Sequence, residues 1–363
     1  MEKELYWIWL STKSHSVRIK LAELIRYFDS IEELYEATDY SSIEGITSQA
    51  KNQLEDKNLD KAKQILDACQ EKQIQVVPFD NDAYPPLLRS ISDPPAVLYA
   101  RGKLRIYENS LPIAVVGTRK CTQYGIDACK VITKDLVNGG AITVSGLAFG
   151  IDAFAAEATI ENDGYTIAVL GTGIDIIYPR HNINLANKIL ETGAIISEFP
   201  PGTRGAKWTF PMRNRIISGI SRGTLVVEAP NTSGALGTAE HALEQGRDVF
   251  CVPGDIFAIQ SVGTNRLIAE GAMAVRSAQD ILSQYPDFKP NKKIDEEQQE
   301  LPQMNDNEKK IYELLLYGEK HIDTLARETL FSMTDLQHTL LSMELNEMVR
   351  HKIGNVYALI ERN

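Results

Sequence analysis

The sequence has few of the features that mark a secreted, membrane-spanning or metal-binding protein. Its 363 residues include four cysteines, Cys69, Cys121, Cys129 and Cys251, which form no CxxC pair and have no metal-ligand spacing with histidine. We therefore predict reduced thiols, no metal site and a cytoplasmic location. No apolar run approaches the ~20 residues that a membrane span needs. The acidic start, MEKELYWIWL, does not fit a signal peptide.

Basic residues are fewer than acidic ones, with 38 Lys and Arg against 49 Asp and Glu, so the net charge is -11. This excludes a protein that coats duplex DNA by overall charge, but screening makes the nearest ~8–10 Å decisive and leaves room for a local basic surface. Residues 201–222 form such an island, with no Asp or Glu and these five cations: Arg204, Lys207, Arg213, Arg215 and Arg222. Because Trp208 and Phe210 lie among them, the segment suits an unpaired nucleic-acid strand, whose phosphates meet cations and whose bases stack on rings. The alternative is a helix cap with surface ion pairs.

Signatures of catalysis are missing. There is no GxxxxGK[ST] phosphate loop and no GxSxG elbow, and the glycine turn at 117–120 lacks the GxGxxG spacing of NAD-binding folds. We predict no catalytic residue and no cofactor. Carboxylates near strand or helix ends are predicted to cap helices or to pair with arginines. They are Asp152, Glu198, Glu228 and Glu240.

Strands and helices alternate from residue 113 to about 282. Near-continuous apolar runs of strand length lie at 113–116, 141–144, 166–170, 194–197, 224–227 and 248–252. Such runs, separated by helical spacing, predict a doubly wound α/β fold with a mostly parallel sheet covered on both faces. The proline-rich stretch 76–112 is predicted to be extended, with little helix.

The flanking segments predict two smaller domains. Residues 1–75 read as a helical module, similar to SAM or helix–hairpin–helix modules. Its first loop, Ser11–Val17, contains no glycine, which favours a plain packing module over a helix–hairpin–helix that binds DNA backbone. Residues 286–306 are predicted to be a linker. Residues 307–363 predict three helices and a hairpin that turns at Gly354-Asn355, the outline of a winged helix. Its third helix, 334–344, has no Arg or Lys, which favours a protein-interaction or vestigial role over DNA binding.

The main domain, 76–285, is expected to carry the binding site. In an open parallel sheet, ligands gather outside the carboxyl ends of the strands. Glycine turns follow several predicted strands, as at Gly117-Thr118-Arg119 and Ser145-Gly146. Glycine lets backbone approach a phosphate, and a helix amino terminus favours an anion. Repeated turns of this kind predict a rim that binds several anions in a row, as an oligonucleotide would require. The cations expected on this rim are Arg119, Arg180, Lys207, Arg213 and Arg215.

Seven stretches in order resemble the DprA/Smf family. They are VVGTRKCTQYG (115–125), SGLAFGID (145–152), AVLGTGIDIIYPRHN (168–182), SEFPPG (197–202), FPMRNRIISG (210–219), SGALGTAEHALEQGRDVFCVPG (233–254) and GTNRLIAEGA (263–272). The resemblance implies an extended Rossmann-like fold and a non-enzymatic homodimer that binds single-stranded DNA without sequence preference. Such proteins protect incoming DNA and load the RecA recombinase during natural transformation and recombination.

The resemblance also implies a binding pocket. Carried over by motif, its residues are Gly117, Arg119, Ser145, Gly146, Arg180, Asn182, Lys207, Phe210, Arg213 and Asn214. Amides and cations are expected to hold phosphates, and Phe210 to offer a stacking face. Asn182 and Asn214 are expected to donate to base edges or backbone oxygens.

The chain departs from the family pattern at several points. Phe149 stands where Arg is frequent and Ala156 where His is frequent, and the first hairpin of the front module lacks its usual glycine. The change at Phe149 either lowers phosphate affinity or supplies a second stacking ring.

Two other functions remain open. The stretch 237–240 (GTAE) is similar to the GGxGTxxE loop of nucleoside-monophosphate phosphoribohydrolases, although Ser233-Gly234 replaces the leading glycine pair and the spacing is off. A purely structural adaptor with a passive rim is the third hypothesis.

Overall fold

The structure, a computed structural model, describes residues 2–17, 21–106, 109–288, 305–315, 319–329, 331–346, 348–352 and 354–359. It divides into two compact units, Met1–Pro290 and Asn291–Asn363. Most of the predicted linker, 289–304, lies outside the described residues. Within the described ranges, no helix has the length and apolarity to cross a membrane.

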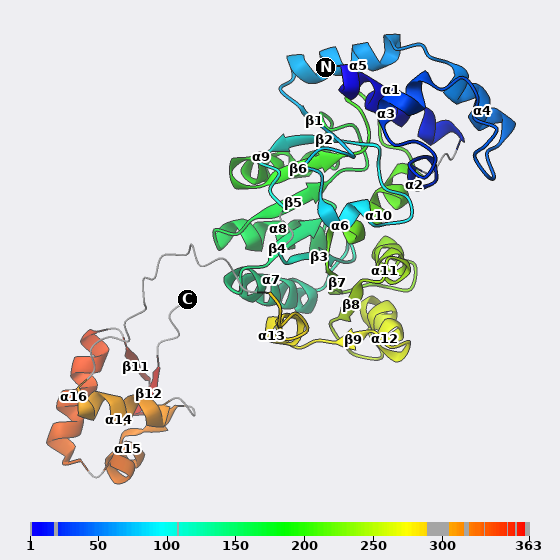
Figure 1. Ribbon diagram of the computed structural model, residues 1–363. Helices are drawn as coiled ribbons and strands as arrows, with labels where there is room; N and C mark the ends of the chain where they lie inside the picture. Colours follow the sequence, from blue (N-terminus) through cyan, green and yellow to red (C-terminus); the bar gives the residue numbers. More distant parts are fainter. Residues whose placement is uncertain are drawn as a thin grey trace. The chain divides into compact units, whose positions relative to one another are not determined.

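A nine-stranded sheet, counted over the described residues, runs through the first unit in the order β1-β2-β6-β5-β4-β3-β7-β8-β9 (Figure 1). Its strands are β1 (Gln75–Pro78), β2 (Val97–Gly102), β3 (Pro112–Val116), β4 (Ile142–Ser145), β5 (Thr166–Val169), β6 (Ala194–Ser197), β7 (Gly223–Val226), β8 (Asp248–Cys251) and β9 (Met273–Ala274). The strands from β3 onward pair in parallel, and β2 pairs antiparallel with both β1 and β6. The six predicted parallel strands and the doubly wound fold are thereby confirmed.

Both faces of the sheet are covered, which explains the apolar runs. Alternate residues of β3 enter different cores: Ile113 and Val115 pack with one set of helices, and Ala114 and Val116 with the other. The first face carries α7 (Gln123–Asn138), α8 (Ile151–Glu161), α9 (Ile183–Thr192) and α13 (Ala278–Leu282). The second carries α6 (Pro86–Arg89), α10 (Thr209–Ile220), α11 (Gly234–Glu244) and α12 (Val262–Ala269).

The strand order reverses at β3. From there the chain builds β4, β5 and β6 toward one edge, and then returns to build β7, β8 and β9 toward the other. The loops that leave β3 and its neighbours diverge at such a reversal and open a crevice beyond the carboxyl ends of the strands. The topology therefore places the ligand site next to β3.

Among the described residues five helices precede the sheet in the chain; the first and the fifth contact β1, and the third and fourth pack on the first (Figure 1). They are α1 (Glu2–Val17), α2 (Leu21–Leu24), α3 (Ile31–Glu36), α4 (Ser48–Glu55) and α5 (Asp60–Glu71). The predicted loop at Ser11–Val17 is wrong, because α1 continues through it. The hydroxyls of Ser11 and Thr12 donate to the carbonyls of Ile8 and Trp9, both at 2.7 Å, so these polar side chains are satisfied within the helix and do not end it.

The second unit is a winged helix, as predicted. It comprises α14 (Asp306–Leu315), β10 (Lys320–His321), α15 (Ile322–Thr329), α16 (Met333–Leu345), β11 (Val349–Lys352) and β12 (Val356–Leu359). The hairpin turns at Gly354 and Asn355, whose φ angles of 87° and 57° suit the tight turn of a twisted hairpin. The third helix, α16, leaves Met333 and Leu341 exposed.

Candidate nucleic-acid interface

A cleft of about 870 Å³ opens at the reversal in strand order. Loops that follow β3, β4, β5, β6 and β7 line it, together with the first turns of α10. Its exposed cations are Arg119, Lys120, Arg204 and Lys207. Among the described residues, no ion pair involves any of these four. The cleft is thus a cationic surface within an acidic chain.

Glu228 fixes the loop that presents Arg119. Its buried carboxylate accepts hydrogen bonds from the backbone nitrogen (2.8 Å) and hydroxyl (2.5 Å) of Thr122, and its carbonyl accepts one from the nitrogen of Thr118 (2.7 Å). A Cβ on Gly117 would lie 2.5 Å from the Ile151 side chain. The glycine is therefore required for packing against α8, and the predicted capping role of Glu228 agrees with these contacts.

Arg213 forms the floor of the cleft. Its guanidinium donates to the carbonyls of Gly146 (2.7 Å) and Val169, and only 5% of the residue is exposed. Burial lowers the pKa of Arg213 to about 10. Burial raises the pKa of Asp152, which accepts a hydrogen bond from the Gly146 nitrogen at 3.0 Å, while nearby Arg213 opposes that rise. Arg213 thus organises loops and, in this geometry, offers the cleft little free donor capacity.

The two asparagines also bind protein carbonyls. The Asn182 amide donates to Leu147 (3.0 Å) and Ala148 (3.3 Å), and the residue is buried. The Asn214 amide donates to Gly234 at 3.2 Å from the wall of the cleft. Both side chains therefore hold loops in place in this structure, whereas donation to DNA was their expected role.

The structure brings together part of the predicted site. Gly117, Arg119, Lys207, Phe210, Arg213 and Asn214 all line the main cleft. Gly146 lines a narrow crevice beside it. Ser145 and Asn182 are buried behind the loops, and Arg180 is exposed at the start of the short helix η1 (Arg180–Asn182), next to the cleft-lining segment that ends at Tyr178.

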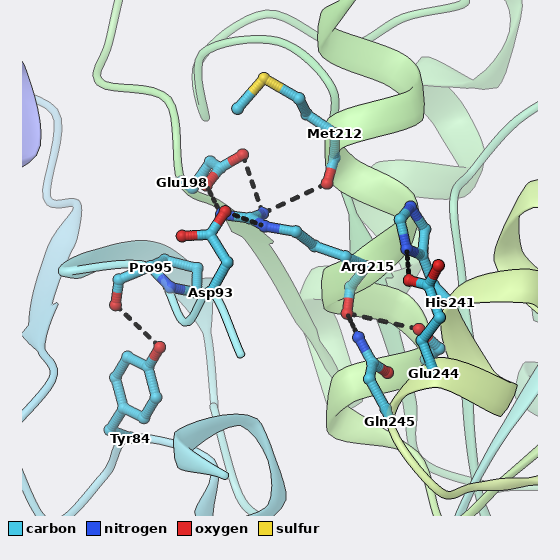
Figure 2. Close-up of polar contacts among 10 residues, drawn as sticks. Tyr84, Asp93, Pro95, Glu198, Met212, Arg215, His241, Glu244 and Gln245 are labelled. Carbon is cyan, nitrogen blue, oxygen red and sulfur yellow. Dashed lines mark hydrogen bonds and ion pairs between the residues drawn. The ribbon is translucent and has the colours of Figure 1, made fainter. Parts of the chain in front are cut away.

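Arg215 is not a rim cation, contrary to the sequence prediction. Its guanidinium forms two hydrogen bonds with the buried Glu198, at 3.1 and 2.7 Å, and one with Asp93 at 3.2 Å (Figure 2). Its carbonyl accepts a hydrogen bond from Gln245 at 2.9 Å. The residue is absent from the cleft lining. Arg213 lines the cleft and Arg215 does not, because residues two apart on a helix such as α10 lie about 200° apart around its axis. The predicted arginine pairing of Glu198 is confirmed.

Two aromatic residues outside the predicted set of site residues also surround the cleft, and for one of them, Phe149, a second stacking ring is one of the two alternatives that the sequence analysis gives. Tyr178 lines it, is 49% exposed, and lies 5.3 Å from Phe210 between ring centroids. Phe149 borders the adjoining crevice and is 44% exposed. Lys120, absent from the predicted site, also lines the cleft, and so does Arg204, one of the five cations of the basic segment 201–222. The signal for both is their position on loops that follow strands, close in sequence to Arg119 and Lys207.

The geometry gives no support to the phosphoribohydrolase alternative. Glu240, the residue that would assist glycosidic cleavage, is exposed on α11 and is absent from the cleft lining, although Thr238 of the same stretch is present there. Over the described ranges, no group of three or more His, Cys, Asp or Glu side chains is placed to hold a metal ion.

Comparison with known proteins assigns the family. The family model described as DNA recombination-mediator protein A matches residues 75–286, and the DprA winged helix domain matches residues 295–355. The chain is 44% identical to DNA processing protein DprA of Bacillus subtilis over 227 residues, which cover 62% of this chain and 76% of the relative. It is 37% identical to its namesake in Streptococcus pneumoniae, over 77% of this chain and 98% of the relative.

Solved structures agree. The X-ray structure of Streptococcus pneumoniae DprA superposes with a TM-score of 0.66 at 35% identity, covering 78% of this chain and 98% of that one. DNA processing protein A of Helicobacter pylori, whose structure addresses its single-stranded DNA binding mode, gives a TM-score of 0.55 at 28% identity, over 60% of this chain and 98% of that one. Sequence motifs, strand topology and the added winged helix all converge, and the chain belongs to the DprA family.

Proposed function

We propose that this protein binds single-stranded DNA in the cleft without sequence preference, and has no catalytic activity. The observation that carries the proposal is a set of four exposed cations, gathered around aromatic rings at the reversal in strand order, that have no carboxylate partner within the part of the chain that the structure describes. Cations neutralise phosphates and rings stack on any base, so this combination recognises an unpaired strand and not a sequence. Membership of the DprA family supports the same conclusion, since a relative's structure concerns single-stranded DNA binding.

The predicted site residues divide into two roles in this proposal. Arg119, Lys207 and Phe210 contact the strand, with Arg180 at one end of its path. The remaining members hold the loops that present them. They are Gly117, Ser145, Gly146, Asn182, Arg213 and Asn214.

The wider biological role follows the family resemblance. We propose that a cytoplasmic homodimer protects incoming DNA and loads RecA during natural transformation and recombination. Gel filtration tests the dimer. Assembly of RecA on DNA in the presence and absence of this protein tests loading, and equal assembly rates would contradict it.

We also propose that the winged helix contacts protein, because α16 has no Arg or Lys and exposes Met333 and Leu341. Unchanged binding to duplex DNA after removal of residues 305–363 would agree with that role.

Substitution of the exposed cleft cations tests the proposed DNA site. We expect Arg119→Ala and Lys207→Ala each to weaken binding to oligo-dT and to flatten its salt dependence by about 0.7 in log–log slope for each lost phosphate contact. Fluorescence anisotropy at several salt concentrations measures both effects. Arg276→Ala is the matched control, because Arg276 is 86% exposed in its side chain and lies outside the cleft. If both cleft variants fold and bind as wild type does, the cleft is not the DNA site.

A further inference from the structure

The loop 146–150 holds Phe149 outward by an unusual backbone. Leu147 has a φ of 53°, although bulky residues rarely adopt positive φ, and Gly150 has a φ of 77°. Leu147 and Ile151 are fully buried on either side of Phe149, which is 44% exposed. The loop thus puts its neighbours into the core and leaves one large apolar ring in water. Strained backbone of this kind clusters at ligand sites, where the surrounding structure sustains it.

Hydrogen bonds from two other segments maintain this loop. The Asn182 amide donates to the carbonyls of Leu147 and Ala148, and the Ile151 nitrogen donates to the Thr118 carbonyl at 3.3 Å. A Cβ on residue 150 would overlap that same carbonyl. The exposure of Phe149 is therefore built into the fold, because three segments of the chain cooperate to produce it.

Phe149 faces the same crevice as the residues of the proposed DNA site. Arg119, Tyr178 and Phe210 line this crevice with it. The crevice holds about 10 Å³, roughly the space of one water molecule, so no base inserts between the rings in this conformation. Ring pairs flank it instead: Tyr178 with Phe210 at 5.3 Å and Phe149 with His181 at 5.9 Å between centroids. The surfaces available to a base are the exposed parts of Tyr178 and Phe149, which are 49% and 44% exposed.

We propose that Phe149 is a base-stacking residue that extends the cleft, with an unpaired nucleobase as its ligand. The strand crosses the crevice with one base on the Tyr178–Phe210 pair and another on Phe149, and Arg119 neutralises phosphate between them. This inference rests on the proposed function, because it assigns a subsite of the same cleft.

Two oligonucleotides of equal charge separate stacking from phosphate binding: oligo-dT and an abasic deoxyribose-phosphate strand of the same length. We expect Phe149→Ala to bind oligo-dT about fivefold or more weakly, since each stacked base contributes at least that factor, and to bind the abasic strand as wild type does. Phe149→Trp should keep its affinity, and its tryptophan fluorescence should fall by more than that of wild type, which already has an exposed Trp208, when oligo-dT binds. Phe257→Ala, at a phenylalanine that is 87% exposed and outside the cleft lining, should match wild type on both strands.

The outcomes distinguish this inference from the proposed function. If Phe149→Ala binds oligo-dT as wild type does while Arg119→Ala weakens binding to both strands, the stacking role is refuted and the cleft stands. Equal weakening of Phe149→Ala on both strands also refutes stacking, because the change then acts through the loop. If wild type fails to bind oligo-dT, the proposed function and the stacking role both fail.

Discussion

Replacement of Arg215 by methionine should destabilise the first unit without altering the DNA site. Glu198 has 2% of its side chain exposed and receives two hydrogen bonds from Arg215, whereas Asp93, the other partner, has 44% exposed (Figure 2). After Arg215→Met, water can solvate Asp93 but not Glu198. The cost is therefore set by one buried, unpaired carboxylate.

The expected magnitude follows from that asymmetry. Removal of one partner from a buried ion pair costs about 3–5 kcal/mol, whereas replacement of both partners by apolar residues of similar volume is often neutral. We expect Arg215→Met to lower the free energy of unfolding of the first unit by roughly this amount. The double variant Glu198→Leu/Arg215→Met should recover most of the loss. The residual cost should come from Asp93 and from the Met212 carbonyl, which accepts a hydrogen bond from Arg215 at 3.2 Å.

Urea denaturation of wild type, Arg215→Met, Glu198→Leu and the double variant gives the four free energies of a double-mutant cycle. Oligo-dT binding is measured at urea concentrations well below the unfolding transition of each protein. We expect binding to stay within about twofold of wild type, because Arg215 does not line the cleft. A double variant as unstable as Arg215→Met would refute the unpaired-carboxylate explanation. Loss of DNA affinity in folded Arg215→Met would show that α10 presents this arginine to DNA after all.

Two further predictions concern packing and pH. Gly146→Ala should lower the free energy of unfolding by about 1–3 kcal/mol, because the added Cβ would overlap the Arg213 guanidinium, which carbonyls hold in place. Gly234→Ala is the control, because its Cβ meets nothing within 4 Å and should leave stability unchanged. Equal shifts of the two variants in thermal unfolding would contradict this. Burial lowers the pKa of Lys57 to about 8, although its amine lies 5.1, 5.2 and 4.9 Å from the ring centroids of Trp9, Tyr35 and Tyr40. Between pH 8 and about 10.4 the unfolded chain therefore binds more protons than the folded chain, so the free energy of unfolding of wild type should rise with pH relative to that of Lys57→Met. Urea denaturation at several pH values measures this, and parallel pH profiles for the two proteins would refute the lowered pKa.

The parallel sheet was predictable because each of its central strands is buried on both faces and therefore reads as an apolar run. The edge strands were not. The edge strand β1 has only four residues, of which the first is exposed, and the edge strand β9 has two exposed residues, so neither shows an apolar run of strand length. The inner strand β2 does contain a buried apolar run at 97–100, but it lies in the proline-rich stretch that was predicted only as extended chain. The error at Ser11–Val17 has a related cause, because polar side chains that bond to carbonyls of their own helix look like a break in the sequence.

The site was predictable as a location but only in part as a set of contacts. The rule that ligands gather beyond the carboxyl ends of strands places the glycine turns correctly next to β3. Sequence could not separate the roles of Arg213 and Arg215 from that of Lys207, because a cation's availability depends on partners far away in the chain. Those partners are the carbonyls of Gly146 and Val169 for Arg213, and Glu198 and Asp93 for Arg215.

This division among the cations limits how strongly salt can act on DNA binding. From the sequence alone, Arg213 and Arg215 would be counted as phosphate contacts, but the guanidinium groups of both form hydrogen bonds with other residues of the protein. The four cations of the cleft that have no ion pair among the described residues, together with Arg180 at the end of the proposed path, allow a log–log salt slope of at most about 3.5 for a single strand. Affinity beyond what such a slope accounts for must come from contacts that salt does not screen, and the exposed rings of Phe149 and Tyr178 are placed to supply them. A weak salt dependence together with tight binding is therefore the signature expected of an acidic protein that holds DNA by its bases as much as by its phosphates.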